Sequence, residues 1–139
     1  MTEQEQYNEL CAYTLSHRGG LFIHQHVVDA WTAQHADEQT KPIALTFALI
    51  GLYLHVEKHY SGTQVQRTHM QTAKRRRRWP TFRLPKDRGR VTVLNVMNAS
   101  PGPERDEAIH RWCASVWQSL SENRDRIIEL LAEVAAGHV

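Results

Sequence analysis

Histidines are concentrated in one apolar stretch of the chain, residues 21–60. Five of the nine lie there: His24, His26, His35, His55 and His59. A carboxylate, Asp29, lies among them. Neutral imidazole is a common ligand of divalent transition metals, and histidine also serves as a general acid or base near neutral pH. This stretch is therefore the first place to look for chemistry, and metal-assisted hydrolysis is the reaction class that these residue types favour.

Two helices must position these side chains. Residues 21–35 and residues 42 to about 59 each have the length and apolar content of a helix, with the polar loop ADEQTK between them. Pro42 suits the first position of the second helix, which is apolar to Leu54 and therefore central. A short loop makes the two helices antiparallel neighbours. Pairing them across a turn near residue 38 places His55 within about one helical turn of His24.

This pairing predicts a polar pocket between the two helices. His55 and His59 are four residues apart and share a helix face, so both can point at one ion. The predicted ligands of a divalent transition metal (zinc, iron or nickel) are His24, Asp29, His55 and His59. The predicted lining of the pocket is His26, Trp31, Tyr53, Tyr13 and Cys11.

Two other interpretations of the histidines stay open. The simpler one makes His24 a hydrogen-bonded core residue, His35 a helix-end cation, and His55 with His59 the solvated end of a core helix. In the other, His26 is a general base and Asp29, three residues later, orients its imidazole. Asp29 lies about 140° around the helix from His24, so the metal set does not converge without help from other helices.

A basic segment, residues 67–90, is the second candidate for function. It holds ten of the seventeen Lys and Arg residues and only one acid, Asp87, so its net charge is +9 and that of the remainder is −7. Within its arm, residues 74–90, the predicted polyanion-binding residues are Lys74, Arg75, Arg76, Arg77, Arg78 and Trp79. Cations beside aromatic rings suit phosphate contact and base stacking. The alternative function is thus a non-catalytic module that binds nucleic acid or an acidic protein partner. Equally, these cations can complement a helix end while Trp79 and Phe82 pack on the core.

The remaining segments indicate an all-α fold. The expected helices cover residues 3–16, 63–75 and 103–120, and a last helix continues to about residue 136. Gly19 and Gly20 follow the end of the first helix. A short helix is expected over residues 92–97, although the alternation of apolar and polar residues in VTVLNV (91–96) also resembles a strand. The expectation is a single domain, residues 1–139, folded as a bundle of five or six helices.

Composition narrows the class of protein. Apolar residues make up 41% and charged residues 23%, as in ordinary globular domains. Two cysteines are too few for a disulfide framework, and the acidic start has no apolar signal core, so we expect a cytoplasmic protein. The apolar run from Ile43 to Leu54 is too short to span a membrane. The apolar helical hairpin of residues 21–60 can also contribute to a homodimer interface.

The order of several motifs resembles a known family. These are ELCAYTL at 9–15, FIHQHVVDAW at 22–31, ALIGLYL at 48–54, Trp79-Pro80, and WCASVW at 112–117. Together they resemble an uncharacterised bacterial family, domain of unknown function (DUF) 5946. The resemblance covers nearly the whole chain. It implies a single helical domain and no established activity.

Overall fold

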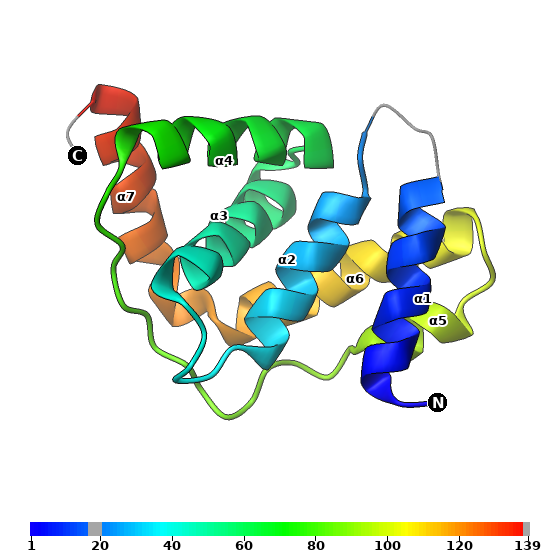
Figure 1. Cartoon of the computed structure of the whole chain (residues 1–139). Coiled ribbons are helices and arrows are strands. Elements are labelled where there is room, and N and C mark those ends of the chain that lie inside the picture. The colour runs from blue at the N-terminus through cyan, green and yellow to red at the C-terminus, as the bar shows by residue number, and fades with distance from the viewer. Residues whose placement is uncertain (17–20, 138–139) are drawn as a thin grey trace.

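The computed structural model describes residues 1–16 and 21–137, and all its regular structure is helical (Figure 1). The elements are α1 (Glu3–Ser16), α2 (His24–His35), α3 (Pro42–Lys58), α4 (Gly62–Arg75), α5 (Val93–Asn98), α6 (Pro103–Ser119), the 3₁₀ turn η1 (Ser121–Asn123) and α7 (Arg124–Ala136). The all-α class is confirmed. The expected count of five or six helices is too low, since these residues form seven α-helices. The helix end predicted at 17–20 lies outside the described residues.

Helix starts follow local sequence signals. Pro42 opens α3 and Pro103 opens α6, where a missing backbone N–H costs nothing. Ser61 and Gln64 form a reciprocal capping box at the start of α4, with hydrogen bonds of 3.2 and 2.8 Å. Thr92 caps α5 in the same way, so the segment that resembled a strand is a helix.

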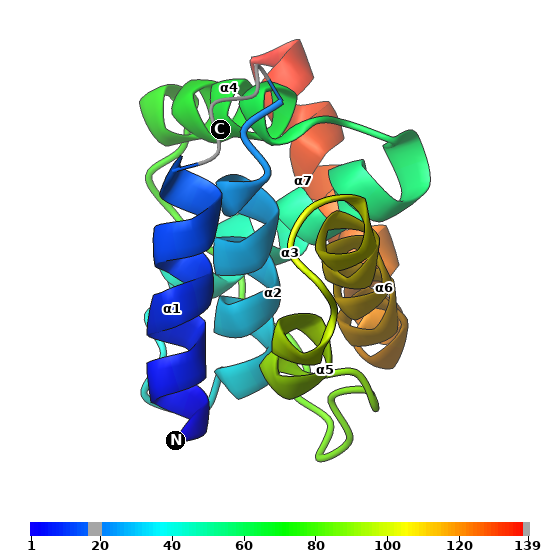
Figure 2. The same cartoon turned by 90° about the vertical axis from the view of Figure 1, so that its right-hand side faces the viewer.

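The core forms where α2, α3 and α6 pack together. α3 is buried along most of its length, and Leu49 and Ile50 are fully inaccessible. α6 contributes Ile109 and Trp112 to this core, both with no exposed surface. α1 lies alongside α2, and α4 crosses the ends of the central helices, as the two views show together (Figures 1 and 2). No helix in the described ranges is both long and apolar enough to cross a membrane.

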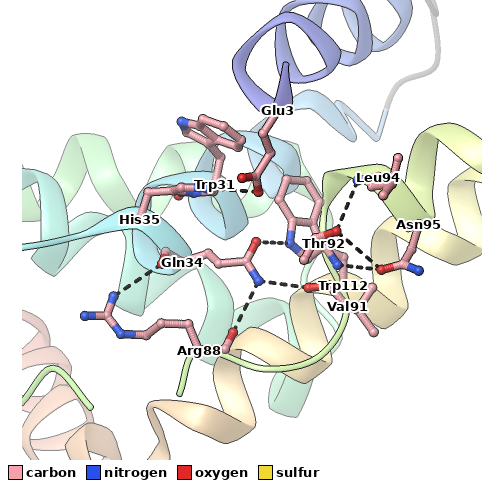
Figure 3. A network of polar contacts seen from close by, with 10 residues as sticks. All are labelled: Glu3, Trp31, Gln34, His35, Arg88, Val91, Thr92, Leu94, Asn95 and Trp112. Carbon is pink, nitrogen blue, oxygen red and sulfur yellow. Dashed lines mark hydrogen bonds and ion pairs between the residues drawn. The ribbon is translucent and has the colours of Figure 1, made fainter. Parts of the chain in front are cut away.

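A polar network fastens the extended segment between α4 and α5 onto the bundle (Figure 3). The side chain of Gln34, at the end of α2, donates to the carbonyls of Arg88 and Val91 and accepts from Trp112 Nε1 at 2.9 Å. Arg88 Nη1 in turn donates to the carbonyl of Ala33 at 3.0 Å. The free carbonyls at the end of α2 are thus satisfied by the segment that runs past them.

Candidate functional site

A pocket of about 760 Å³ opens where α2, α3, α4 and α6 approach one another. Four of its lining residues are histidines, two are the charged residues Arg67 and Asp106, and the rest come mostly from the segments around residues 21–23 and 60–64. The full lining is Leu21, Phe22, Ile23, His26, His55, His59, Tyr60, Ser61, Thr63, Gln64, Arg67, Asp106 and His110. Its volume suits a small molecule.

Three of these histidines, here called the histidine trio, form one contact group. His26 comes from α2, His55 from α3 and His110 from α6. The rings of His26 and His55 stack with centroids 3.5 Å apart, and those of His55 and His110 lie 4.8 Å apart. His55 Nε2 and His110 Nδ1 are 2.8 Å apart, a hydrogen-bond distance. Residues more than eighty positions apart in sequence therefore share one wall of the pocket.

The tautomer of His55 follows from its surroundings. Its Nδ1 lies 3.0 Å from the carbonyl oxygen of Tyr60, which can only accept, so Nδ1 carries the proton. In the neutral ring, Nε2 is then the lone pair that faces His110. Burial, together with the neighbouring imidazoles, lowers the pKa of His55. A carbonyl that fixes one ring nitrogen and frees the other is the usual support of a histidine ligand.

His26 is the buried member of the trio. Its side chain is 3% exposed, and burial, followed by repulsion from His55 and His110, lowers its pKa to about 3. The ring is therefore neutral at pH 7. Its Nδ1 is buried and makes no hydrogen bond with any described residue. Asp106 Oδ1, on α6 one turn before His110, is likewise buried and unpaired. Buried polar atoms without a partner are uncommon, and two border this one pocket.

The four ligands predicted from sequence do not lie together. His55 lies in the trio and His59 lines the pocket, but His24 turns toward α1, where its Nδ1 is 2.8 Å from Thr14 Oγ1. Asp29 points away from the pocket into the contact of α2 with α3 and α4. The structure therefore does not bring these four side chains to one point. As the side chains stand, no group of three or more His, Cys, Asp and Glu within residues 1–16 and 21–137 is arranged to hold a metal ion.

Asp29 occupies a buried polar niche of its own. It is 2% exposed, and its Oδ1 accepts from Gln25 Nε2 at 3.1 Å. His69 Nε2 lies 3.8 Å from the same oxygen, too far for a hydrogen bond. Burial raises the Asp29 pKa to about 6, against the opposing effects of His69 and Gln25. The carboxylate fits only because Gly51 has no side chain: a Cβ there would lie 1.8 Å from Asp29 Oδ2.

The pairing register explains the difference. His26 faces His55 and Asp29 faces Gly51, so the turn between α2 and α3 is centred about two residues later than expected. A turn displaced by two residues changes the partner of each residue by four, which is about one helical turn along α2. It brings His26 to the place where His24 was expected. α2 also begins at His24 instead of Leu21, so His24 lies in its first turn beside α1.

Of the five predicted lining residues, only His26 lines the pocket. Trp31 is sandwiched between Tyr7 and His35 on the outside of α2, with centroids 4.2 and 3.8 Å away. Tyr53 is buried near Trp117. Tyr13 accepts a hydrogen bond from the Gly102 N–H at 2.7 Å. Cys11 is half-buried, and burial raises its pKa. Trp31 thus packs α2 against α1, Tyr53 packs α3 near α6, and Tyr13 links α1 to the residue before α6.

Sequence reasoning missed His110 and Asp106, and it assigned Arg67 to the basic segment and not to the pocket. The Asp106–His110 pair has the i, i+4 spacing that places two side chains on one helix face, so a signal was present. It was hidden beside the apolar stripe of α6, which contains Ile109 and Trp112. Nothing in the sequence indicates that this face meets α3 at His55, because that contact is tertiary.

In the basic segment, some cationic side chains bind other parts of the bundle and others are exposed without an ion pair. Arg75 donates to the Val134 carbonyl at 2.8 Å, and Arg76 pairs with Glu133 at 2.9 Å. Trp79 packs edge-on against Phe47, with centroids 5.4 Å apart. Part of the predicted polyanion-binding set therefore attaches the segment to α7 and α3. Lys74, Arg77 and Arg78 are exposed, and their side chains make no ion pair with the described residues.

Comparison with known proteins gives a family and no activity. No curated protein and no solved structure matches this chain. A family model does match, over residues 4–121, a range that runs from the second residue of α1 past the end of α6 and contains every residue of the pocket. The resemblance drawn from the motifs is thereby confirmed: the chain belongs to the family of unknown function DUF5946.

Proposed function

We propose that the pocket is a hydrolytic active site in which the histidine trio, His26, His55 and His110, binds a divalent transition metal. One observation carries the proposal: three imidazoles from three helices meet on the wall of a pocket large enough for a small substrate. Three protein ligands and one open position are the usual pattern of a catalytic zinc site. This keeps the reaction class expected from sequence and changes the ligands.

Two of the trio are close to ligand geometry. A tetrahedral ion with metal–nitrogen bonds of 2.0–2.1 Å holds two ligand nitrogens about 3.3 Å apart. His55 Nε2 and His110 Nδ1 are 2.8 Å apart, so opening their contact by about half an ångström admits the ion. The Tyr60 carbonyl already orients His55 with its Nε2 lone pair toward that point.

The third ligand has to move. Rings bound to one tetrahedral ion have centroids about 5 Å apart. His55 and His110, at 4.8 Å, fit this spacing, and His26 and His110, at 6.2 Å, are near it. His26 and His55, stacked at 3.5 Å, are too close. Metal binding therefore requires His26 to leave the stack. Its unpaired Nδ1 loses no hydrogen bond by doing so.

The pocket also supplies groups for the reaction. A bound divalent ion lowers the pKa of its water to about 7 and so provides a hydroxide nucleophile at neutral pH. Asp106 lines the same pocket one turn before His110 and is unpaired at Oδ1, which supports a role as the acceptor of that water's proton. Held by the histidine trio, the ion would supply a nucleophile for attack on the electrophilic carbon or phosphorus of the substrate, and Asp106 would return the proton to the leaving group.

Metal analysis of untagged protein tests the proposal. We expect stoichiometric zinc, iron or nickel in the wild type and its loss in His55→Ala and His110→Ala. His35→Ala is the matched control, because His35 lies on α2 but outside the pocket, against Trp31 and Glu3. Wild-type protein that stays metal-free after incubation with each ion would remove the metal from the account.

The free cations of the basic segment favour a second candidate, binding of nucleic acid or an acidic partner. Lys74, Arg77 and Arg78 are exposed and unpaired, while their neighbours fix the backbone that carries them. Phosphate contacts would give binding that weakens linearly on a log–log plot against salt. Replacing the three by Gln should reduce that slope. Binding of single-stranded RNA that is unchanged by the triple replacement would exclude this candidate.

A further inference from the structure

The rim of the pocket carries a cation that the trio does not use. Arg67, on α4, is exposed and lines the pocket, yet its guanidinium makes no hydrogen bond or ion pair with any residue of the described ranges. Its neighbours in the first turn of α4 are already occupied: the Gln64 N–H donates to Ser61 Oγ and the Thr63 N–H to the Leu21 carbonyl. Arg67 is therefore the group at this end of α4 that is left to meet a ligand.

The rim also carries an unusual backbone. His59 has φ 60° and ψ 31°, the left-handed conformation, where it caps α3 with its N–H on the Leu54 carbonyl. Glycine is the usual residue at such a cap, because a Cβ there is strained. Within residues 1–16 and 21–137, Phe22 is the other non-glycine residue with positive φ, and it also lines the pocket. Such strain clusters at functional sites.

We propose that Arg67 and His59 form an oxyanion subsite, which binds the phosphate or carboxylate group of a small substrate beside the trio. An exposed guanidinium offers paired N–H donors in a fixed plane, the arrangement that matches both anions. A second group at the same cavity also lacks a partner: His26, which lines it, is 97% buried, and its Nδ1 makes no hydrogen bond with the described residues.

The arrangement of charge orients the substrate. Asp106 is the one carboxylate among the lining residues, and it lies on α6 beside His110, whereas Arg67 lies on α4. An anionic group is attracted to the α4 side and repelled from the α6 side. The bond to be cleaved then faces the trio. The pocket, at about 760 Å³, admits one small molecule and excludes a folded partner. The substrate class rests on the proposed hydrolysis, while the anion subsite itself does not.

Titration of metal-free protein tests the subsite. In EDTA, inorganic phosphate and, separately, succinate are titrated while backbone amide resonances of Tyr60 to Gln64 are followed. We expect saturable binding of at least one anion, weakened at least about tenfold in Arg67→Gln, the usual loss for a charge-assisted contact. Lys74→Gln is the matched control, since it removes another exposed, unpaired cation two turns further along α4. The affinity of the Lys74→Gln protein for the anion should stay within about twofold of the wild type, because Lys74 does not line the pocket.

The outcomes separate the two proposals. No binding of either anion, or equal weakening in Arg67→Gln and Lys74→Gln, overturns the subsite. The tighter of phosphate and succinate identifies the substrate class. Because this titration excludes metal and the metal analysis uses no anion, a protein that holds metal but no oxyanion keeps the proposed function and loses the subsite. A protein that binds an oxyanion but no metal keeps the subsite and loses the proposed function.

Discussion

At the scale of single residues, His59 should show a trade-off between stability and binding. Glycine occupies the left-handed region without strain, so His59→Gly should increase the free energy of unfolding by about 0.5–1 kcal/mol. The same change removes an imidazole from the rim and should weaken phosphate binding. Urea denaturation and the anion titration measure the two effects.

His59→Ala separates the backbone from the side chain. Alanine loses the imidazole but keeps the strained Cβ, so it should lose affinity as glycine does and gain no stability. If glycine and alanine gave equal stability, left-handed strain at His59 would not be the cause.

Asp29 should make stability depend on pH. Its pKa is about 6 in the folded protein, against 3.8 ordinarily, so between those values the folded state holds a proton that the unfolded chain lacks. This contribution to stability is therefore present at low pH and is lost as pH rises through 6. The groups facing Asp29 are His69 on α4, Cys113 on α6 and Tyr7 on α1. Asp29→Asn should mimic the protonated side chain.

The comparison of the two proteins isolates that carboxylate. Two pKa units correspond to about 3 kcal/mol, an upper bound on what Asp29→Asn gains at pH 7. The gain should vanish near pH 4, where the wild-type carboxyl is protonated as well. Titrating groups that do not face Asp29 act on both proteins and cancel. Denaturation at the two pH values measures this, and a constant difference between the proteins would contradict it.

The sequence predicted which residues could do chemistry better than where they lie. Three of the nine residues predicted as metal ligands or pocket lining, His26, His55 and His59, line the pocket. Their helices were recognisable from apolar periodicity and from Pro42. Which histidine faces α3 depends on the register of α2, and a shift of two residues moved His24 and Asp29 elsewhere. Local pattern does not fix a register between two helices of this kind.

At the scale of elements, the contact of α2 with α3 depends on Gly51. Gly51→Ala places a methyl group 1.8 Å from Asp29 Oδ2, a distance that forces the helices apart or the carboxylate out of its niche. We expect it to destabilise the protein by about 2 kcal/mol or more, as overpacking of a tight core does. Chemical denaturation with thermal melting as a check measures the loss.

A double mutant identifies the cause. Asp29→Ala removes the carboxylate that the new Cβ would meet, so Gly51→Ala should cost much less in that background. Additive losses would mean that the helix contact fails for another reason.

Element boundaries were largely readable from the sequence, because they depend on local chemistry. Pro103 and the acids after it mark the start of α6, and the stripe through Trp112 marks its buried face. The short helix α5 was the least certain, since VTVLNV alternates like a strand. The capping box of Thr92 and Asn95, together with contacts to α1 and α6, decides for a helix.

At the scale of the whole molecule, the basic segment holds the bundle together as well as carrying charge. Arg88 closes the end of α2 through the Ala33 and Gln34 carbonyls, and Figure 3 draws its contact with Gln34. Arg77, by contrast, is exposed and unpaired. Arg88→Gln should therefore destabilise the protein by about 1–3 kcal/mol, and Arg77→Gln by less than about 0.5 kcal/mol. Urea denaturation of both variants measures this. Equal losses of unfolding free energy in the two variants would show that the Arg88 network does not stabilise the protein.

The pocket is likewise a property of the whole fold. Its histidines come from α2, α3 and α6, so no stretch of sequence contains it. The alternation of helix and loop predicts a bundle, but the meeting of His55 with His110 requires α6 to pack back on α3 at the right rotation. Sequence reasoning therefore reached the fold class and one part of the site.

The most direct measurement of the central claim is a cobalt(II) titration followed by visible absorption, which reports tetrahedral coordination in place of zinc. The wild type and His24→Ala should both develop the intense bands of a tetrahedral site at one ion per chain. His55→Ala and His110→Ala should not. Absence of these bands in the wild type, or their loss in His24→Ala with retention in His110→Ala, would contradict the assignment of the trio as the site.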